Sequence, residues 1–241
     1  MARCGEGGVV SEVVIRVRVT WPQTFRVIRS IYPPIDLFED IADPHDWEAL
    51  VAVEEKTNPR IRFEIGELGK VPLARRVSGP GASYLMAPFV HCSTLRPGRF
   101  TDGSYGIYYA GNREDVAVAE TIHHHEQFMR ATNESAGWTS HFRVLKGSVD
   151  CELDDIGDAP NLLHPADYGP SRMEGSRLRS TGSNGLVWDS VRMAGGRCIG
   201  IFWPDVIPIP VQGRHYCYHW NGSRVDFVRE HDTGFVRSVT G

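Results

Sequence analysis

The chain has 241 residues, of which 41% are hydrophobic, so it is long enough to bury a sizeable core as a single domain. Its formal net charge of -4 removes the long-range attraction to phosphate backbones on which non-specific nucleic-acid binders depend. The longest apolar runs, such as 200–203, fall well short of the roughly 20 residues that cross a bilayer, and the N-terminus lacks the pattern of a secretory signal. We therefore expect a cytoplasmic protein that binds neither a membrane nor, by itself, nucleic acid.

Cysteine spacing argues against a disulfide framework and against a zinc site. The number of cysteines is odd, and no two of them form a C-x-x-C pair. They are Cys4, Cys92, Cys151, Cys198 and Cys217. We expect reduced thiols in the core.

The N-terminal part of the chain predicts two strands. Residues 13–21 alternate at period two, and a second, shorter strand follows at 24–28. Two arginines, Arg26 and Arg29, lie on or just after this second strand.

A helix is predicted over residues 44–57. Asp43 is placed to cap it, Pro44 stands at its first position, and Asn58-Pro59 ends it. Its apolar residues at helical spacing are Trp47, Leu50 and Val51. A loop then runs to Gly81, and a short apolar helix follows at 83–91.

The middle of the chain predicts a strand followed by a long helix. Asp102-Gly103 is a turn signal, and residues 106–110 are typical of a short buried strand. The next segment, 112–132, has Asn112 as a candidate N-cap and Asp115 in the capping-box position. It is the strongest helical pattern in the sequence.

The later half predicts strands over 139–155, 198–204 and 215–230, the last folded into a hairpin at Asn221-Gly222. No internal repeat is present. The expected class is α+β, with residues 1–241 as a single domain that has a mixed or antiparallel sheet core and flanking helices.

Three consecutive histidines, His123, His124 and His125, raise the question of a metal site. Neighbouring residues on a helix are separated by about 100° around its axis, so the side chains of three in a row cannot converge on one ion. No two histidines of this run are four residues apart, the spacing that a helical zinc pair needs. We therefore expect no metal, with His125 in the apolar stripe as a satisfied core residue and the other two solvated. A metal-dependent hydrolase that uses the histidines stays as the alternative.

Glu120 lies on the helical face of Val116, His123 and Gln127, away from the main apolar stripe. By pattern alone, such a residue is typical of a solvated helix surface. The same position also lets it point into a cleft.

Read in order, several segments resemble the RES domain family. They are FRV at 25–27, GRF at 98–100, the tyrosine pair at 108–109, the helix that carries Glu120, and GLVWDSVR at 185–192. The resemblance covers roughly residues 24–210, with a helical insertion within 30–97, and its most specific part is 98–120. The best-known members of that family are toxins of bacterial toxin–antitoxin pairs that consume NAD, and their fold is similar to that of ADP-ribosyltransferases.

The resemblance implies roles for five residues. Glu120 is the family's glutamate and Ser190 its serine, Arg26 is its first arginine, Arg99 is the arginine of its G-R-[FW] motif, and Tyr109 is its strand tyrosine. These would be catalytic or NAD-binding residues. Two assignments stay open, because Arg29 is close to Arg26, and Tyr108 replaces Tyr109 if the strand register differs by one.

The residue types suit NAD as a substrate. Arginine's fork of donors matches a pyrophosphate, a tyrosine face suits the cationic nicotinamide ring, and a carboxylate can stabilise an oxocarbenium-like ribose. No G-x-G-x-x-G motif precedes a helix, so NAD would be consumed rather than held as a cofactor.

We therefore expect an NAD glycohydrolase, an NAD phosphorylase or an ADP-ribosyltransferase, whose acceptor is water, phosphate or protein. A small helical antitoxin is the expected protein partner, and a homodimer is left open. Besides the metal-dependent hydrolase, the second alternative is a catalytically silent module that only senses NAD.

Overall fold

The computed structural model describes residues 14–41 and 43–239, with the side chains of residues 40 and 41 left aside. Its helices are α1 (Trp47–Glu54), α2 (Ile61–Ile65), α3 (Ala82–Val90), α4 (Glu114–Thr132) and α5 (Gly169–Ser180), with short helical turns at Leu37–Ile41, Leu68–Lys70, Leu73–Arg75 and Pro204–Val206. Its strands are β1 (Ile15–Arg29), β2 (Tyr108–Gly111), β3 (Trp138–Gly157), β4 (Gly185–Asp189), β5 (Arg197–Ile201), β6 (Val211–Trp220), β7 (Val225–Glu230) and β8 (Val236–Ser238). No helix within this part of the chain is long and apolar enough to cross a membrane.

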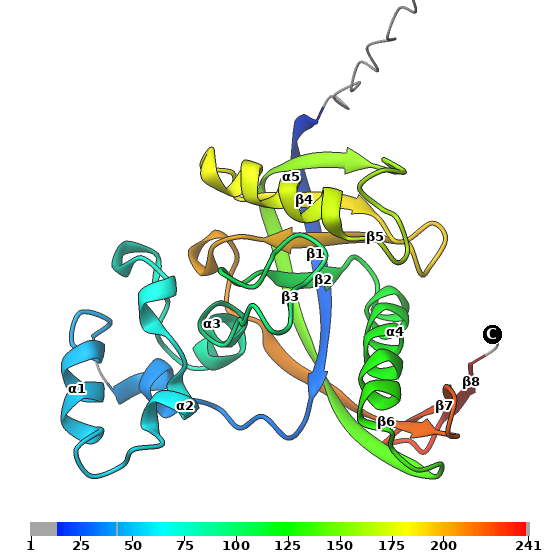
Figure 1. Ribbon diagram of the computed structural model, residues 1–241, viewed down its shortest axis with the longest axis horizontal. Coiled ribbons are helices and arrows are strands. Elements are labelled where there is room, and N and C mark those ends of the chain that lie inside the picture. The colour runs from blue at the N-terminus through cyan, green and yellow to red at the C-terminus, as the bar shows by residue number, and fades with distance from the viewer. Residues whose placement is uncertain (1–13, 42, 240–241) are drawn as a thin grey trace, which may run out of the picture.

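The strands form one mixed sheet whose pairings close on themselves. The order is β1-β2-β5-β4-β3-β6-β7-β8, and β1 also pairs with β3 along most of its length. Of these pairings only β3–β4 is parallel. Five strands therefore make a ring, β1-β2-β5-β4-β3, from which β6, β7 and β8 extend. In Figure 1 the long β1–β3 pair is crossed by β2, β5 and β4. The predicted α+β class with a mixed sheet is confirmed.

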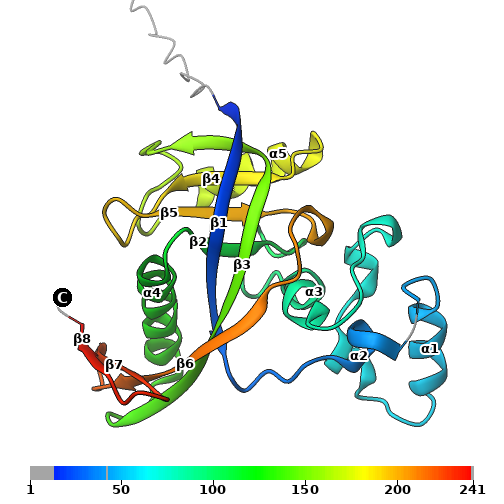
Figure 2. The same ribbon diagram turned by 180° about the vertical axis from the view of Figure 1, so that it is seen from behind.

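The helices lie in different places around this sheet. Helix α4 lies beside β1 and β2, α5 lies by β4, and the helices before residue 97 gather on the side of the molecule away from α4 (Figures 1 and 2). Residues 30–97, where a helical insertion is predicted, contain α1, α2, α3 and the short turns between them.

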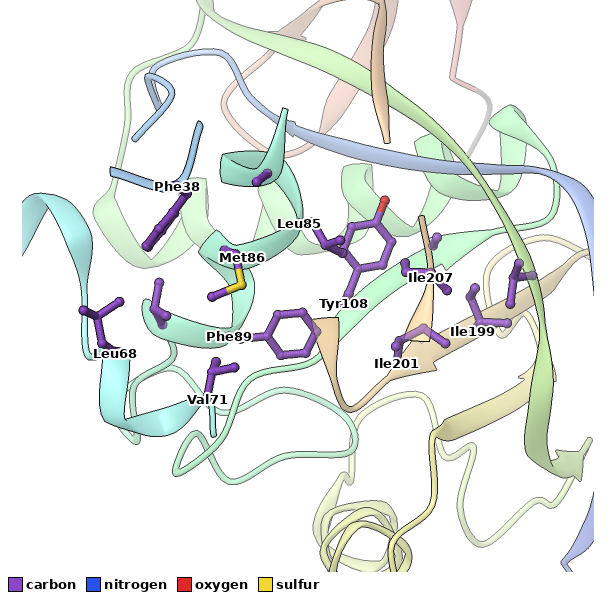
Figure 3. Packing of buried hydrophobic residues seen from close by; sticks show 14 of the residues in the cluster. Phe38, Leu68, Val71, Leu85, Met86, Phe89, Tyr108, Ile199, Ile201 and Ile207 are labelled. Carbon is purple, nitrogen blue, oxygen red and sulfur yellow. The ribbon is translucent and has the colours of Figure 1, made fainter. Parts of the chain in front are cut away.

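Alternation along the ring strands gives the sheet two apolar faces. Tyr108 and Ile199 belong to one core cluster, into which α3 places Leu85, Met86 and Phe89 (Figure 3). Tyr109 and Cys198, one residue away on the same strands, belong to the cluster on the other face. Because successive strand residues point to opposite faces, the register decides the face of the sheet to which each candidate side chain points.

Several expectations about element boundaries are corrected. The strands predicted at 13–21 and 24–28 are one strand, β1, with a register shift between Trp21 and Thr24, and residue 13 lies outside the described residues. Helix α1 begins at Trp47 rather than at 44, because residues 44–46 form a turn in which Asp43 accepts the His45 backbone N–H at 2.9 Å.

Asn112 does not cap α4. Its side-chain oxygen accepts the backbone N–H of Arg197 at 3.0 Å, so it joins β2 to β5, and the N-cap position is taken by Arg113 without a side-chain cap. The cysteines Cys92, Cys151, Cys198 and Cys217 are free thiols, while Cys4 lies outside the described residues.

Candidate active site

Helix α4 presents one polar face to the loop between β4 and β5. Val116, one turn before Glu120, is buried against this loop, and a Cβ atom on Gly196 would come within 2.3 Å of its Cγ2. A glycine at 196 therefore allows the loop to pack close to the helix. Glu120 and His123 follow on the same face of α4, as the helical spacing predicts.

Glu120 and Ser190 are in direct contact. The Ser190 hydroxyl donates to Glu120 Oε1 at 2.8 Å, and the thiol of Cys198 lies 3.8 Å from the same oxygen. Burial raises the pKa of Cys198, so its thiol keeps its proton. Glu120 Oε2 accepts no hydrogen bond from any described residue. The carboxylate is thus held through one oxygen, and the other stays available.

Ser190 is itself fixed by the start of the β4–β5 loop. Its hydroxyl oxygen accepts the backbone N–H of Arg192 at 3.2 Å and of Met193 at 3.1 Å, and its own N–H donates to the Gly196 carbonyl at 2.8 Å. Because its acceptor capacity is used by the backbone, its hydroxyl proton is directed to Glu120. Ser190 thus makes turn bonds to the backbone and a contact with Glu120 at the same time.

Arg99 is a buried cation on the segment before β2. Its side chain is only 8% exposed, donates to the His164 carbonyl at 2.9 Å, and lies 4.2 Å from the centroid of the Tyr168 ring. Burial lowers the pKa of Arg99, and the nearby Arg192 acts in the same direction, while Tyr168 and Glu120 oppose it. Arginine stays charged in such surroundings. No carboxylate of the described residues forms an ion pair with it.

Tyr109 fixes the turn that carries Arg99. Its hydroxyl accepts the Phe100 backbone N–H at 3.3 Å, and a Cβ atom at Gly98 would lie 3.0 Å from that hydroxyl. The ring also meets Trp188 edge-on, with 6.2 Å between centroids. Tyr109 therefore lies on the face of the sheet that holds Cys198, whereas Tyr108 lies on the opposite face.

Arg26 and Arg29 lie elsewhere. The Arg26 guanidinium is 4.9 Å from the Tyr108 ring and donates to the Tyr109 carbonyl at 3.0 Å, so it lies with Tyr108. Arg29 faces Phe128 and Phe142, at 5.9 and 5.7 Å from their ring centroids. No hydrogen bond or ion pair within the described residues joins either arginine to Glu120.

The three histidines have different surroundings. His123 Nε2 is 2.9 Å from Nη2 of Arg192, which corrects the expectation that it is solvated, while His124 is exposed. His125 is 5% exposed and buried as predicted, but its Nε2 has no hydrogen-bond partner, so it is not satisfied. No three His, Cys, Asp or Glu residues of ranges 14–41 and 43–239 are arranged to hold a metal ion.

Three residues near Glu120 or Arg99 have no role in the NAD site that the sequence predicts. Arg192 ends the quoted GLVWDSVR segment and His123 is three positions after Glu120 on the same helix, so both had a local signal. Tyr168 lies in a segment without any motif, and only the fold brings it under Arg99. A pocket of about 500 Å³ lies away from this site and is lined by residues of the insertion, from Glu48 to Lys70.

A family model of the RES domain matches residues 73–221, and the chain belongs to the RES domain family. The match includes Arg99, Tyr109, Glu120 and Ser190, whereas Arg26 precedes it.

Two further comparisons are with whole chains. The uncharacterized protein y4oC of Sinorhizobium fredii (strain NBRC 101917 / NGR234) is 30% identical over 213 residues, which cover 86% of this chain and 87% of that protein. The crystal structure of the M. tuberculosis MbcT–MbcA toxin–antitoxin complex aligns with a TM-score of 0.40 and 9% identity, over 83% of this chain and 86% of that one.

Proposed function

We propose that this RES-domain protein consumes NAD by cleaving the bond between nicotinamide and ribose. The observation that carries the proposal is the Glu120 carboxylate, held by Ser190 at 2.8 Å through one oxygen, while the other oxygen accepts no hydrogen bond from the residues that the structure describes. A carboxylate fixed in this way can stabilise positive charge that develops on a substrate.

The chemistry needs little more than that charge. When the C–N bond breaks, its electron pair leaves with nicotinamide, which is cationic while attached and neutral once released. The departing group therefore needs no general acid, and the positive charge stays on the oxocarbenium-like ribosyl centre. Glu120 would stabilise that centre, and Ser190 would keep the carboxylate in place.

Arg99 supports an anionic substrate. It is buried, positively charged and held by a carbonyl and an aromatic ring rather than by a carboxylate. A guanidinium of this kind is suited to a phosphate oxygen, and NAD carries two adjacent phosphates. NAD is thus a substrate in this proposal, and no cofactor is required.

The group that accepts ADP-ribose is left open among water, phosphate and a protein side chain. Each adds to the same electrophilic ribose carbon and gives up a proton as it does so. The reaction is accordingly that of an NAD glycohydrolase, an NAD phosphorylase or an ADP-ribosyltransferase.

We also propose that the chain acts as the toxin of a toxin–antitoxin pair, a part of the proposal that rests on membership of the RES family. A chain that depletes NAD needs a partner to restrain it. A small helical antitoxin that places a carboxylate against the arginines would block the pyrophosphate position.

The test is to incubate the purified protein with NAD and to identify the products by mass. Release of nicotinamide with ADP-ribose, ADP-ribose 1-phosphate or an ADP-ribosylated protein distinguishes the three acceptors. Binding of NAD without release of nicotinamide would favour the silent sensor. Activity that is lost on chelation and restored by zinc would favour the metal-dependent hydrolase.

A further inference from the structure

Two arginines from distant parts of the chain bind neighbouring carbonyls of one loop. Arg99 Nη1 donates to the His164 carbonyl at 2.9 Å, and Arg192 Nη2 donates to the Pro165 carbonyl at 2.7 Å. Consecutive residues are only 3.8 Å apart at their Cα atoms, so the loop brings the two guanidinium groups to one place.

This loop is stiffened by its own hydrogen bonds. His164 Nδ1 accepts the backbone N–H of Ala166 at 3.2 Å and of Asp167 at 2.8 Å. Tyr168, which lies under Arg99, follows directly. The positions of both arginines are therefore set by a fixed piece of backbone rather than by mobile acidic side chains.

Neither arginine is neutralised within the described part of the chain. Arg192 donates to an uncharged carbonyl and to the ring of His123, and its Nε is buried without a hydrogen-bond partner. Burial and the neighbouring Arg192 lower the pKa of His123 to about 4, so its ring is neutral near pH 7 and can accept from the guanidinium. Two cations that one loop holds side by side, neither with an ion pair among the described residues, point to an anion that comes from outside the protein.

Arg26 is placed differently. It lies over Tyr108, on the face of the sheet opposite Tyr109, and it donates to the Tyr109 carbonyl. Its contacts are those of a residue that supports strand β2.

We propose that Arg192, rather than Arg26, is the second arginine of the anion site, and that it binds the pyrophosphate of NAD together with Arg99. His123 acts as a positioning residue, because its ring nitrogen orients the Arg192 guanidinium. This inference rests on the proposed function and names the part of the substrate that the site recognises.

The first experiment measures binding in the Glu120→Gln background, where turnover does not interfere. Calorimetric titration with NAD compares Arg192→Ala with Arg26→Ala, and Arg179→Ala serves as the matched control. Arg179 is also an arginine without an ion pair among the described residues, and it packs on Trp203 at 4.0 Å. We expect Arg192→Ala to weaken NAD binding tenfold to a hundredfold, as loss of a charge-assisted hydrogen bond does. The other two should bind within about twofold of the parent.

Inorganic pyrophosphate is the second probe and separates the two proposals. We expect it to compete with NAD in the parent and in Arg26→Ala, and to fail in Arg192→Ala. If the parent binds pyrophosphate through Arg192 but neither binds nor cleaves NAD, the proposed function is wrong and the anion site stands. If Arg192→Ala keeps full affinity for both probes, the anion site is wrong whatever the activity.

Arg192→Lys covers the case in which the alanine variant does not fold. A lysine keeps the charge but cannot reach Pro165 and a phosphate with a rigid fork, so we expect binding to stay at least about tenfold weaker than in the parent. Full recovery with lysine would show that only net charge matters and would overturn the proposed fork.

His123 is tested in the active protein through kinetics. His123→Leu removes the acceptor for Arg192 and should raise KM for NAD severalfold while kcat changes little, and His123→Gln, which restores an acceptor, should recover KM. An equal fall of kcat in both variants, with KM unchanged, would contradict the positioning role.

Discussion

The two faces of helix α4 carry the same residue types and use them in opposite ways. On one face, Glu120 has one carboxylate oxygen that accepts no hydrogen bond from the described residues, and His123 contacts Arg192, which forms no ion pair with them. On the other side of the helix, which we call the structural face and which carries His125 and Glu126, both oxygens of Glu126 have partners within the protein. Glu126 pairs with Arg130 at 2.9 Å and accepts the Val225 backbone N–H at 2.8 Å. His125 is buried beside Phe142, with 5.0 Å between ring centroids.

This difference teaches that residue type and proximity in sequence say little about role on a helix. Two histidines two positions apart are rotated by about 200° and meet unrelated surroundings. Matched substitutions on the two faces therefore test whether their residues differ in function.

The largest effect is expected for Glu120→Gln. Glutamine keeps an oxygen for the Ser190 hydroxyl but removes the negative charge, so we expect kcat for NAD cleavage to fall by about 10²–10³, with folding and NAD binding retained. The control is Glu126→Gln on the same helix, which should lose stability but keep activity. NAD cleavage and thermal melting are measured for both, and equal losses of activity would refute the distinction between the faces.

Arg99→Ala is the next largest. Loss of a charge-assisted phosphate contact, worth about 1.5–3 kcal/mol, should raise the NAD requirement about tenfold to a hundredfold, and Arg99→Lys should recover little of it. Arg29→Ala is the matched control, because Arg29 packs against Phe128 and Phe142 and not beside Glu120. The pyrophosphate assignment fails if Arg29→Ala loses NAD affinity while Arg99→Ala keeps it.

Ser190→Ala should have a smaller effect that falls on kcat. The Glu120 carboxylate loses its hydrogen bond at 2.8 Å but keeps its charge, so we expect about a tenfold decrease with KM for NAD little changed. Steady-state kinetics provide the measurement. A decrease as large as that of Glu120→Gln would instead give the serine a direct role in the reaction.

The smallest effect is expected for His125, and it concerns the free energy of unfolding rather than activity. Burial lowers the pKa of His125 from 6.5 to about 4, with Arg29 acting in the same direction. As pH falls below 6.5, the unfolded chain takes up a proton that the folded protein refuses, so this contribution to stability is lost progressively down to pH 4. His125→Phe should flatten the dependence of unfolding free energy on pH over that range. If the difference in unfolding free energy between pH 7 and pH 5, measured by denaturant titration, is the same in the parent and in His125→Phe, this origin is ruled out.

The elements around the site could be predicted where periodicity was strong. The strand at 106–110 and the helix at 112–132 appear as β2 and α4, within a few residues. Helix α5 has no such signal, because it is polar and buries only Ser171, Gly175 and Leu178. At Gly175 a Cβ atom would come within 2.1 Å of the Phe100 carbonyl oxygen. The glycine therefore allows α5 to pack closely on the segment that carries Arg99, although glycine is unfavourable within a helix.

The helix starts were predicted less well, because capping residues found other partners. Asp43 and Asn112 both have the side chain of an N-cap, yet Asn112 is engaged by Arg197 across the sheet. Local rules cannot anticipate a partner 85 residues away.

For the candidate site, the motifs placed Glu120 and Ser190 in one set, and the fold brings them into contact. Arg192 ended a quoted motif but had no stated role, since its importance comes from Pro165 and His123, both distant in sequence. The side of the sheet on which Arg26 lies depends on strand register, which one residue can reverse.

The loop that holds Arg99 and Arg192 does so with carbonyl oxygens, and this has a consequence for how an anion enters. An arginine held by a carboxylate must exchange one partner for another, so the two charges partly cancel before and after binding. At the proposed site, an incoming anion would displace water and dissolved counter-ions instead. Chloride in the buffer should therefore compete for the proposed site, and its concentration must be held constant between variants.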